Sequence, residues 1–143
     1  MEQNARIEKQ FKKANSYISS ANRNFIFSLE KPEDKLEKAI EILEELVTEF
    51  KIKKMIPEYK NTLIKLADAN EKVYNITKER HYKTSQSFVL LDLIKAIEKN
   101  DGVFGNKELF SLANRYISVV EETGNDDGVL KATEYIGNLY MNS

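Results

Sequence analysis

The clearest structural signature in the chain lies at residues 32–50, which read PEDKLEKAIEILEELVTEF. Proline at the first helical position needs no amide partner, and the two acids that follow favour the positive end of a helix dipole. Apolar side chains then recur at steps of three and four, which is the helical period, while the charged residues between them form a solvated face. The side chains expected to point inward are Leu36, Ala39, Ile40, Leu43, Val47 and Phe50.

The same period recurs on both sides of this stretch and predicts six helices. The first runs from about residue 4 to 23, the second from 32 to 53, and the third from Pro57 to about Lys78. A fourth ends near residue 99, and two more follow the turn NDGVFGN at residues 100–106. The fourth is expected to be the most buried, with Ser85, Phe88, Val89, Leu91, Leu93, Ala96 and Ile97 facing inward. Small residues are expected where helices approach closely, namely at Ala67, Ala96, Ala113 and Gly137.

Six helices joined by short turns predict a single all-α domain over residues 1–143. The helices are expected to pair as antiparallel hairpins at about 4–53, 57–99 and 107–141. The spacing of about 50 residues between hairpin starts exceeds the tetratricopeptide unit of about 34, and the strict tetratricopeptide signature is absent. We therefore expect a tetratricopeptide-like right-handed solenoid.

Composition argues against catalysis and nucleic-acid binding. The chain has 22 basic and 23 acidic side chains, a formal net charge of −1, no cysteine and one histidine, His81. This balance gives no general attraction to nucleic acid, and no thiolate metal site or cysteine–histidine dyad can be built. No phosphate-binding glycine loop or nucleophile motif is present. We expect no enzyme activity, no metal or cofactor, and no small-molecule substrate.

The expected location is the cytoplasm. The first 20 residues are charged throughout and lack the apolar core of a signal peptide. The most apolar stretch, residues 88–97, is interrupted by Asp92 and Lys95 and is shorter than the roughly 20 apolar residues that cross a bilayer.

One connecting segment is unusually apolar. The sequence NRNFIFSLEKP at residues 22–32 places Phe25, Ile26, Phe27 and Leu29 within a predicted loop. These side chains could fold back as a cap on the first hairpin. Alternatively they form an exposed finger, in which each would gain roughly 1.5 to 3 kcal/mol on entering an apolar phase. The sequence leaves both readings open.

The order of these segments resembles the amino-terminal region of the soluble NSF attachment proteins, with alpha-type members nearest. The similarity covers nearly all 143 residues and is carried by FKKANSYISSANRNFIFSL, AIEILEELVTEF, LIKAIEKND, LANRYISVVEETG and LKATEYIGNLY. The family coats SNARE helical bundles and recruits the ATPase NSF, which separates the bundle. The resemblance implies a non-enzymatic adaptor in vesicle trafficking that lies peripherally on the cytosolic face of membranes.

The resemblance also implies site residues. Phe25, Ile26, Phe27 and Leu29 correspond to the family's membrane-contact loop, and Lys99 and Lys131 to lysines that meet acidic SNARE side chains. Residues 125–127, Asn-Asp-Asp, occupy a turn where the family tends to be basic, which weakens attraction to an acidic bundle.

The family's carboxy-terminal bundle, which contacts NSF, has no counterpart here. We therefore expect either a fragment of a longer protein or a short relative, and the ending LYMNS favours a fragment. The alternative to the adaptor is a generic helical-repeat scaffold with an unrelated partner.

Overall fold

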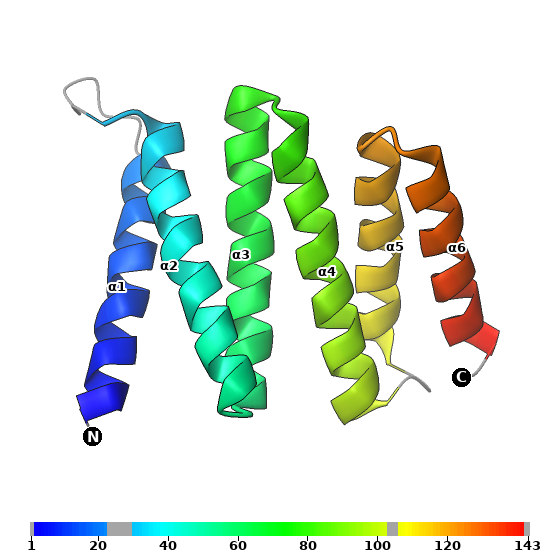
Figure 1. Ribbon diagram of the computed structural model, residues 1–143, viewed down its shortest axis with the longest axis horizontal. Helices are drawn as coiled ribbons and strands as arrows, with labels where there is room; N and C mark the ends of the chain where they lie inside the picture. Colours follow the sequence, from blue (N-terminus) through cyan, green and yellow to red (C-terminus); the bar gives the residue numbers. More distant parts are fainter. Residues whose placement is uncertain (1, 23–29, 103–105, 142–143) are drawn as a thin grey trace.

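The computed structural model describes residues 2–22, 30–102 and 106–141, and these residues form helices joined by short turns (Figure 1). The expected all-α fold with six helices is confirmed for this part of the chain. The helices are α1 (Glu2–Asn22), α2 (Pro32–Ile52), α3 (Ile56–Thr77), α4 (Arg80–Asp101), α5 (Lys107–Glu122) and α6 (Asp126–Met141).

The six helices stand side by side in a row, each antiparallel to the one before it (Figure 1). All extensive packing in the described residues is between helices consecutive in sequence, from α1 against α2 to α5 against α6. The first and last helices lie at opposite ends of the row and do not close on each other. This arrangement is solenoid-like, as expected for stacked helical hairpins.

Local sequence explains where several helices begin. Pro32 occupies the first turn of α2, followed by Glu33 and Asp34. Asn106 caps α5, because its side-chain oxygen accepts a hydrogen bond of 3.1 Å from the backbone amide of Leu109. Asn125 does the same for α6, accepting from the amide of Gly128 at 3.1 Å. Capping oxygens satisfy amides that have no partner within the helix.

The core follows the expected stripes on most helices. On α2, five of the six side chains expected to point inward are buried, and Phe50 stacks on Phe11 of α1 with 5.8 Å between ring centroids. Val47 was expected inside but is only partly buried, while Leu46 is fully buried. The buried face is wide because α2 packs against both α1 and α3.

The inward face of α4 differs from the expected one. Phe88 is 63% exposed and Ser85 is also exposed, so the prediction that these two side chains point inward is wrong. The buried stripe contains Gln86, Leu90, Leu93 and Ile97, and Phe88 is two positions from Gln86. Two positions rotate a helix by about 200°, which places Phe88 on the opposite face. Both faces of α4 carry apolar residues, so periodicity alone could not select the buried one.

Buried polar side chains connect neighbouring helices. Lys83 of α4 is 4% exposed and forms an ion pair of 3.0 Å with Glu122 of α5. Its ammonium also lies 4.8 Å from the ring centroid of Tyr74 on α3, a cation–π contact. Asn70, which interrupts the apolar stripe of α3, is buried and donates a 3.0 Å hydrogen bond to the Leu66 carbonyl. These groups are buried with partners, as low dielectric surroundings require.

Gly137 does not mark a close approach between helices. The glycine is exposed, and a β-carbon added to it would meet no described atom within 4 Å, so this expectation is wrong. Ala67, Ala96 and Ala113 are buried as expected. In the middle of an exposed helix face, glycine only adds flexibility to the unfolded chain.

We predict that Gly137→Ala raises the free energy of unfolding by about 0.5–1 kcal/mol, because alanine restricts the unfolded chain without a clash. Urea unfolding followed by circular dichroism measures the change. The control is Gly124→Ala in the α5–α6 turn, where φ is +74°. That substitution should lower stability by about 1 kcal/mol, because a β-carbon is disfavoured in the left-handed region. Equal shifts in one direction contradict this account.

Candidate functional site

Contacts between alternate helices divide the row into two layers. Tyr82 of α4 donates a hydrogen bond to Glu37 of α2, and Tyr135 of α6 donates one of 2.9 Å to Glu98 of α4. These bonds pass over α3 and α5, so α2, α4 and α6 form one layer. We refer to it as the even layer, and to α1, α3 and α5 as the odd layer.

The basic side chains that bridge helices of the odd layer have partners. Arg115 of α5 forms ion pairs with Asp68 at 3.1 Å and with Glu71 at 3.2 Å, both on α3. Lys65 of α3 donates a 3.2 Å hydrogen bond to Asn15 of α1 and lies 5.2 Å from the ring centroid of Phe11. These charges are used in holding the layer together.

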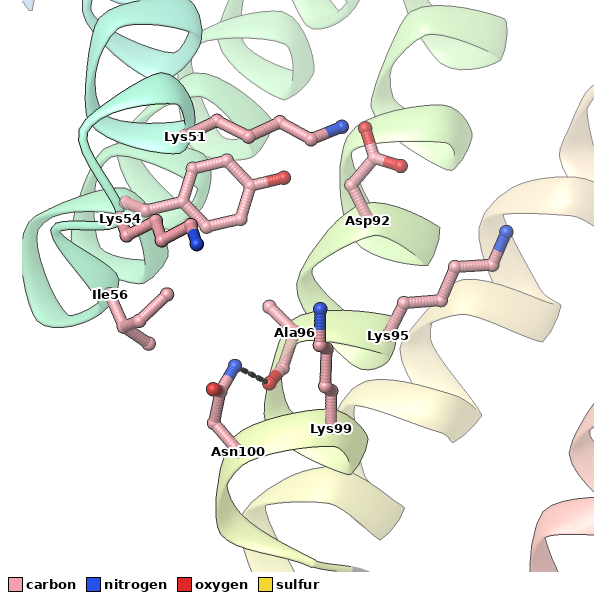
Figure 2. Close-up of a pocket in the computed structure, with 9 residues that line it drawn as sticks. Lys51, Lys54, Ile56, Asp92, Lys95, Ala96, Lys99 and Asn100 are labelled. Atoms are coloured by element: carbon pink, nitrogen blue, oxygen red, sulfur yellow. Dashed lines mark hydrogen bonds between the residues drawn. The ribbon is translucent and has the colours of Figure 1, made fainter.

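The even layer instead contains a basic cleft, which Figure 2 shows between the end of α2 and the face of α4. The cleft has a volume of about 540 Å³. Lys51 comes from α2, Lys54 from the α2–α3 turn, and Lys95 and Lys99 from α4. All four are exposed, and within the described residues none forms an ion pair. Four like charges that converge beside a single carboxylate attract an anionic partner.

The floor of this basic cleft is apolar, and its wall carries a single acid. Ile56, Tyr59 and Ala96 line the cleft, and the last two are buried. Asp92 stands on α4, and Figure 2 shows the Lys51 side chain extending toward it across the opening. Burial, and then the charge of Asp92, raises the pKa of the Tyr59 hydroxyl above its ordinary value. The site therefore presents four cations, one carboxylate and a neutral phenol.

The backbone at Lys54 is held in an unusual conformation. Its φ is 56°, in the left-handed region, and its amide donates a 3.2 Å hydrogen bond to the Lys51 carbonyl. A side chain in this region costs about 1 kcal/mol, and glycine is the residue that avoids the cost. Lys78, the C-cap of α3, has a similar φ of 59° but does not line the basic cleft. The two lysines form a natural comparison.

The structure separates the two lysines that the family resemblance selected. Lys99 lines the basic cleft, whereas Lys131 is exposed on α6 and does not. The hydrogen bond from Tyr135 to Glu98 places these two residues side by side on α6 and α4. Lys131 lies one turn before Tyr135, and Lys95 lies about one turn before Glu98. Residues three or four apart share a helix face, and α4 and α6 run in the same direction (Figure 1). Lys131 and Lys95 therefore both lie on the even layer.

Sequence reasoning did not identify Lys51 and Lys95 as site residues. The spacing of Lys95 and Lys99, one helical turn, was a usable signal, because such residues share a face. Lys51 and Lys54 are separated from them by all of α3, and only the packing of both α2 and α4 against α3 brings them together. Phe88 was also missed: it precedes Asp92, Lys95 and Lys99 on one stripe of α4 and is exposed.

Other sequence predictions have simple outcomes. The proposed membrane-contact residues Phe25, Ile26, Phe27 and Leu29 lie outside the described residues. His81 is exposed at the start of α4, with its Nδ1 3.4 Å from a carboxylate oxygen of Glu79. No cluster of metal-ligating side chains occurs within residues 2–22, 30–102 and 106–141. In the same ranges, no helix combines the length and apolar character needed to cross a bilayer.

We predict that Tyr82→Phe lowers the free energy of unfolding at neutral pH by about 1 kcal/mol, because it removes the hydrogen bond from α4 to α2. Urea unfolding at pH 7 measures it. Tyr17→Phe is the control, since the Tyr17 hydroxyl has no hydrogen bond to any described residue. Matching losses in both variants would contradict a bridging role.

The same variant should change the response to alkaline pH. Burial, and then the hydrogen bond to Glu37, raises the pKa of Tyr82 above its ordinary value of 10.0. The unfolded chain therefore loses this proton first, so stability is fully present below pH 10 and falls as pH rises above it. Tyr82→Phe should lose less stability than the parent above pH 10, and a parallel loss would contradict the assignment.

Comparison with known proteins assigns no family to the chain. No family model matches it, and no curated protein or solved structure gives a significant match.

Proposed function

We propose that this chain is a non-enzymatic adaptor whose even layer binds an acidic helical partner, with a SNARE-type bundle as the leading candidate. The proposal is based on the basic cleft, whose lysines include Lys99 and form no ion pair within the described residues. Lys131 is exposed on the same layer. Both lysines are positions that the family resemblance implies as SNARE contacts. In the same proposal the bound adaptor helps to recruit an NSF-type ATPase.

The charge distribution supports this choice of layer. The whole chain has a net charge of only −1, yet four cations with one acid gather at the basic cleft. Such segregation steers acidic partners and fixes their orientation. The acidic turn opposes it less than its sequence suggests, because Asp126 and Asp127 lie in the first turn of α6, where the helix dipole favours them.

The exposed Phe88 adds an apolar contact to the same surface. Phe88, Asp92, Lys95 and Lys99 follow one another at steps of four, three and four along α4. A partner helix with acidic residues on one edge and apolar residues beside them would complement this stripe. The stripe equally suits an amphipathic acidic helix that is not a SNARE, so a generic helical-repeat scaffold is the second candidate.

We predict that Lys99→Gln combined with Lys131→Gln weakens binding to an assembled soluble SNARE bundle by about three- to tenfold, because two exposed attractive contacts are lost. Calorimetry at low salt measures the dissociation constant. Lys12→Gln with Lys13→Gln on α1 is the matched control, since it makes the same charge change on exposed residues of the odd layer. Equal weakening by both pairs would assign the effect to overall charge. Binding only to an unrelated acidic helix would favour the scaffold.

Peripheral membrane contact is the second part of the proposal, and it depends on Phe25, Ile26, Phe27 and Leu29. We predict that the parent chain floats with neutral phosphatidylcholine vesicles and that Phe25→Ser with Phe27→Ser abolishes most of this association, because about 1.5–3 kcal/mol per side chain is lost. Phe88→Ser is the control for a different exposed aromatic residue. Unchanged flotation of the double variant would refute the hydrophobic finger.

A further inference from the structure

The basic cleft has a second property that an extended acidic helix does not explain. Its four lysines approach from three separate segments: the end of α2, the α2–α3 turn and the face of α4. A helix presents carboxylates along a line, and Lys95 and Lys99, one turn apart on α4, match such a line. Cations that surround a concavity are suited to one compact ligand with several negative charges.

We propose that the basic cleft is a binding site for a compact ligand bearing several phosphate groups, either a free polyphosphorylated cyclitol or the headgroup of a phosphoinositide. The cleft volume of about 540 Å³ accommodates a six-membered ring with its phosphate substituents. The site shares Lys95 and Lys99 with the surface proposed for the protein partner, and it differs from that surface because Lys51 and Lys54 line the cleft and Lys131 does not.

The charge of the ligand group favours phosphate over carboxylate, because a phosphate monoester carries about −1.5 to −2 charges at pH 7 and a carboxylate carries one. All four cations are lysines, whose ammonium groups act as compact point charges with three donors each. Long flexible stems let each lysine reach a different phosphate oxygen. The four ammonium groups have no acidic partner among the described residues, so no intramolecular ion pair has to break when a ligand enters.

The apolar floor of the basic cleft points to the same use. Ile56, Tyr59 and Ala96 offer carbon surface against which a ring can lie while its phosphates reach the lysines. Lys54 has a left-handed backbone because it ends α2 in a hydrogen-bonded turn, where the Met55 amide donates to the Phe50 carbonyl at 3.0 Å. This turn places Lys54 in the lining of the basic cleft.

The test is isothermal titration calorimetry of the full chain with myo-inositol hexakisphosphate at fixed salt. Lys51→Gln with Lys95→Gln should weaken binding by about tenfold, since two of four charge-assisted contacts are removed. Lys131→Gln should change it by less than about twofold, because an exposed charge outside the site is screened. Benzenehexacarboxylate, a six-fold carboxylate, is the chemical control and should bind at least about tenfold more weakly, because each carboxylate carries less negative charge than a phosphate monoester.

Substitution by glycine provides a sharper comparison. Lys54→Gly and Lys78→Gly should each raise the midpoint of thermal unfolding by a few degrees, because both relieve the same backbone conformation. Only Lys54→Gly should weaken hexakisphosphate binding, by about threefold, since it alone removes a cleft cation. Weakened binding in a more stable protein cannot come from misfolding. Equal binding by both variants would remove Lys54 from the site.

Vesicles distinguish the two sources of the ligand. The chain carrying Phe25→Ser and Phe27→Ser, which removes the proposed finger, is floated with phosphatidylcholine vesicles with or without phosphatidylinositol 4,5-bisphosphate. If only the vesicles that contain phosphatidylinositol 4,5-bisphosphate recruit the chain, and soluble inositol 1,4,5-trisphosphate reverses this recruitment, the ligand is the lipid headgroup. Hexakisphosphate binding without recruitment assigns a free ligand. The proposal is overturned if the chain binds neither hexakisphosphate nor the vesicles that contain the bisphosphate. It is also overturned if the hexacarboxylate binds equally well, or if Lys51→Gln with Lys95→Gln retains binding. Because Lys99 is common to both proposals, Lys131→Gln alone separates them: it should weaken SNARE binding and leave hexakisphosphate binding nearly unchanged.

Discussion

Each helix of this chain buries its apolar stripe against only the helices next to it in sequence. Phe50 of α2, Leu63 of α3 and Leu90 of α4 are buried in one continuous core, yet helices far apart in the row share no extensive contact. Burying apolar area is the main favourable term in folding, and here it is obtained locally, between neighbours. Consequently the row stays open, and its long sides are available for other molecules.

The open row gives each layer a different task. In the odd layer, Arg115 and Lys65 bridge neighbouring helices through Asp68, Glu71 and Asn15. In the even layer, hydroxyl groups of Tyr82 and Tyr135 make the bridges, and these use no cation. Within the described residues, Lys51, Lys54, Lys95 and Lys99 form no ion pair. A nearly neutral protein acquires a positive surface in this way, and the proposed functions rest on it.

The strained turn at Lys54 fits the same pattern. Stability alone would favour glycine there, as it favours alanine at Gly137. At Gly137 the loss of stability brings no packing advantage, because no other helix packs against this position. At Lys54 the cost places a charge on the wall of the basic cleft. Backbone strain therefore becomes informative about function only when the geometry around it is known.

The sequence by itself determined the helices and the starts of α2 and α5, but it predicted a turn at about Glu79–Tyr82, where α4 already begins at Arg80. Pro32, Glu33, Asp34 and the capping Asn106 act within one turn of their own positions, so local chemistry suffices to read them. Tertiary structure decided which face of α4 is buried and which lysines meet. Phe88 and Leu90 are similarly apolar, and only the neighbouring helices select Leu90 for the core. Lys51 and Lys99 are brought together by the packing of α2, α3 and α4, which depends on side-chain shape summed over three helices and has no short sequence signature.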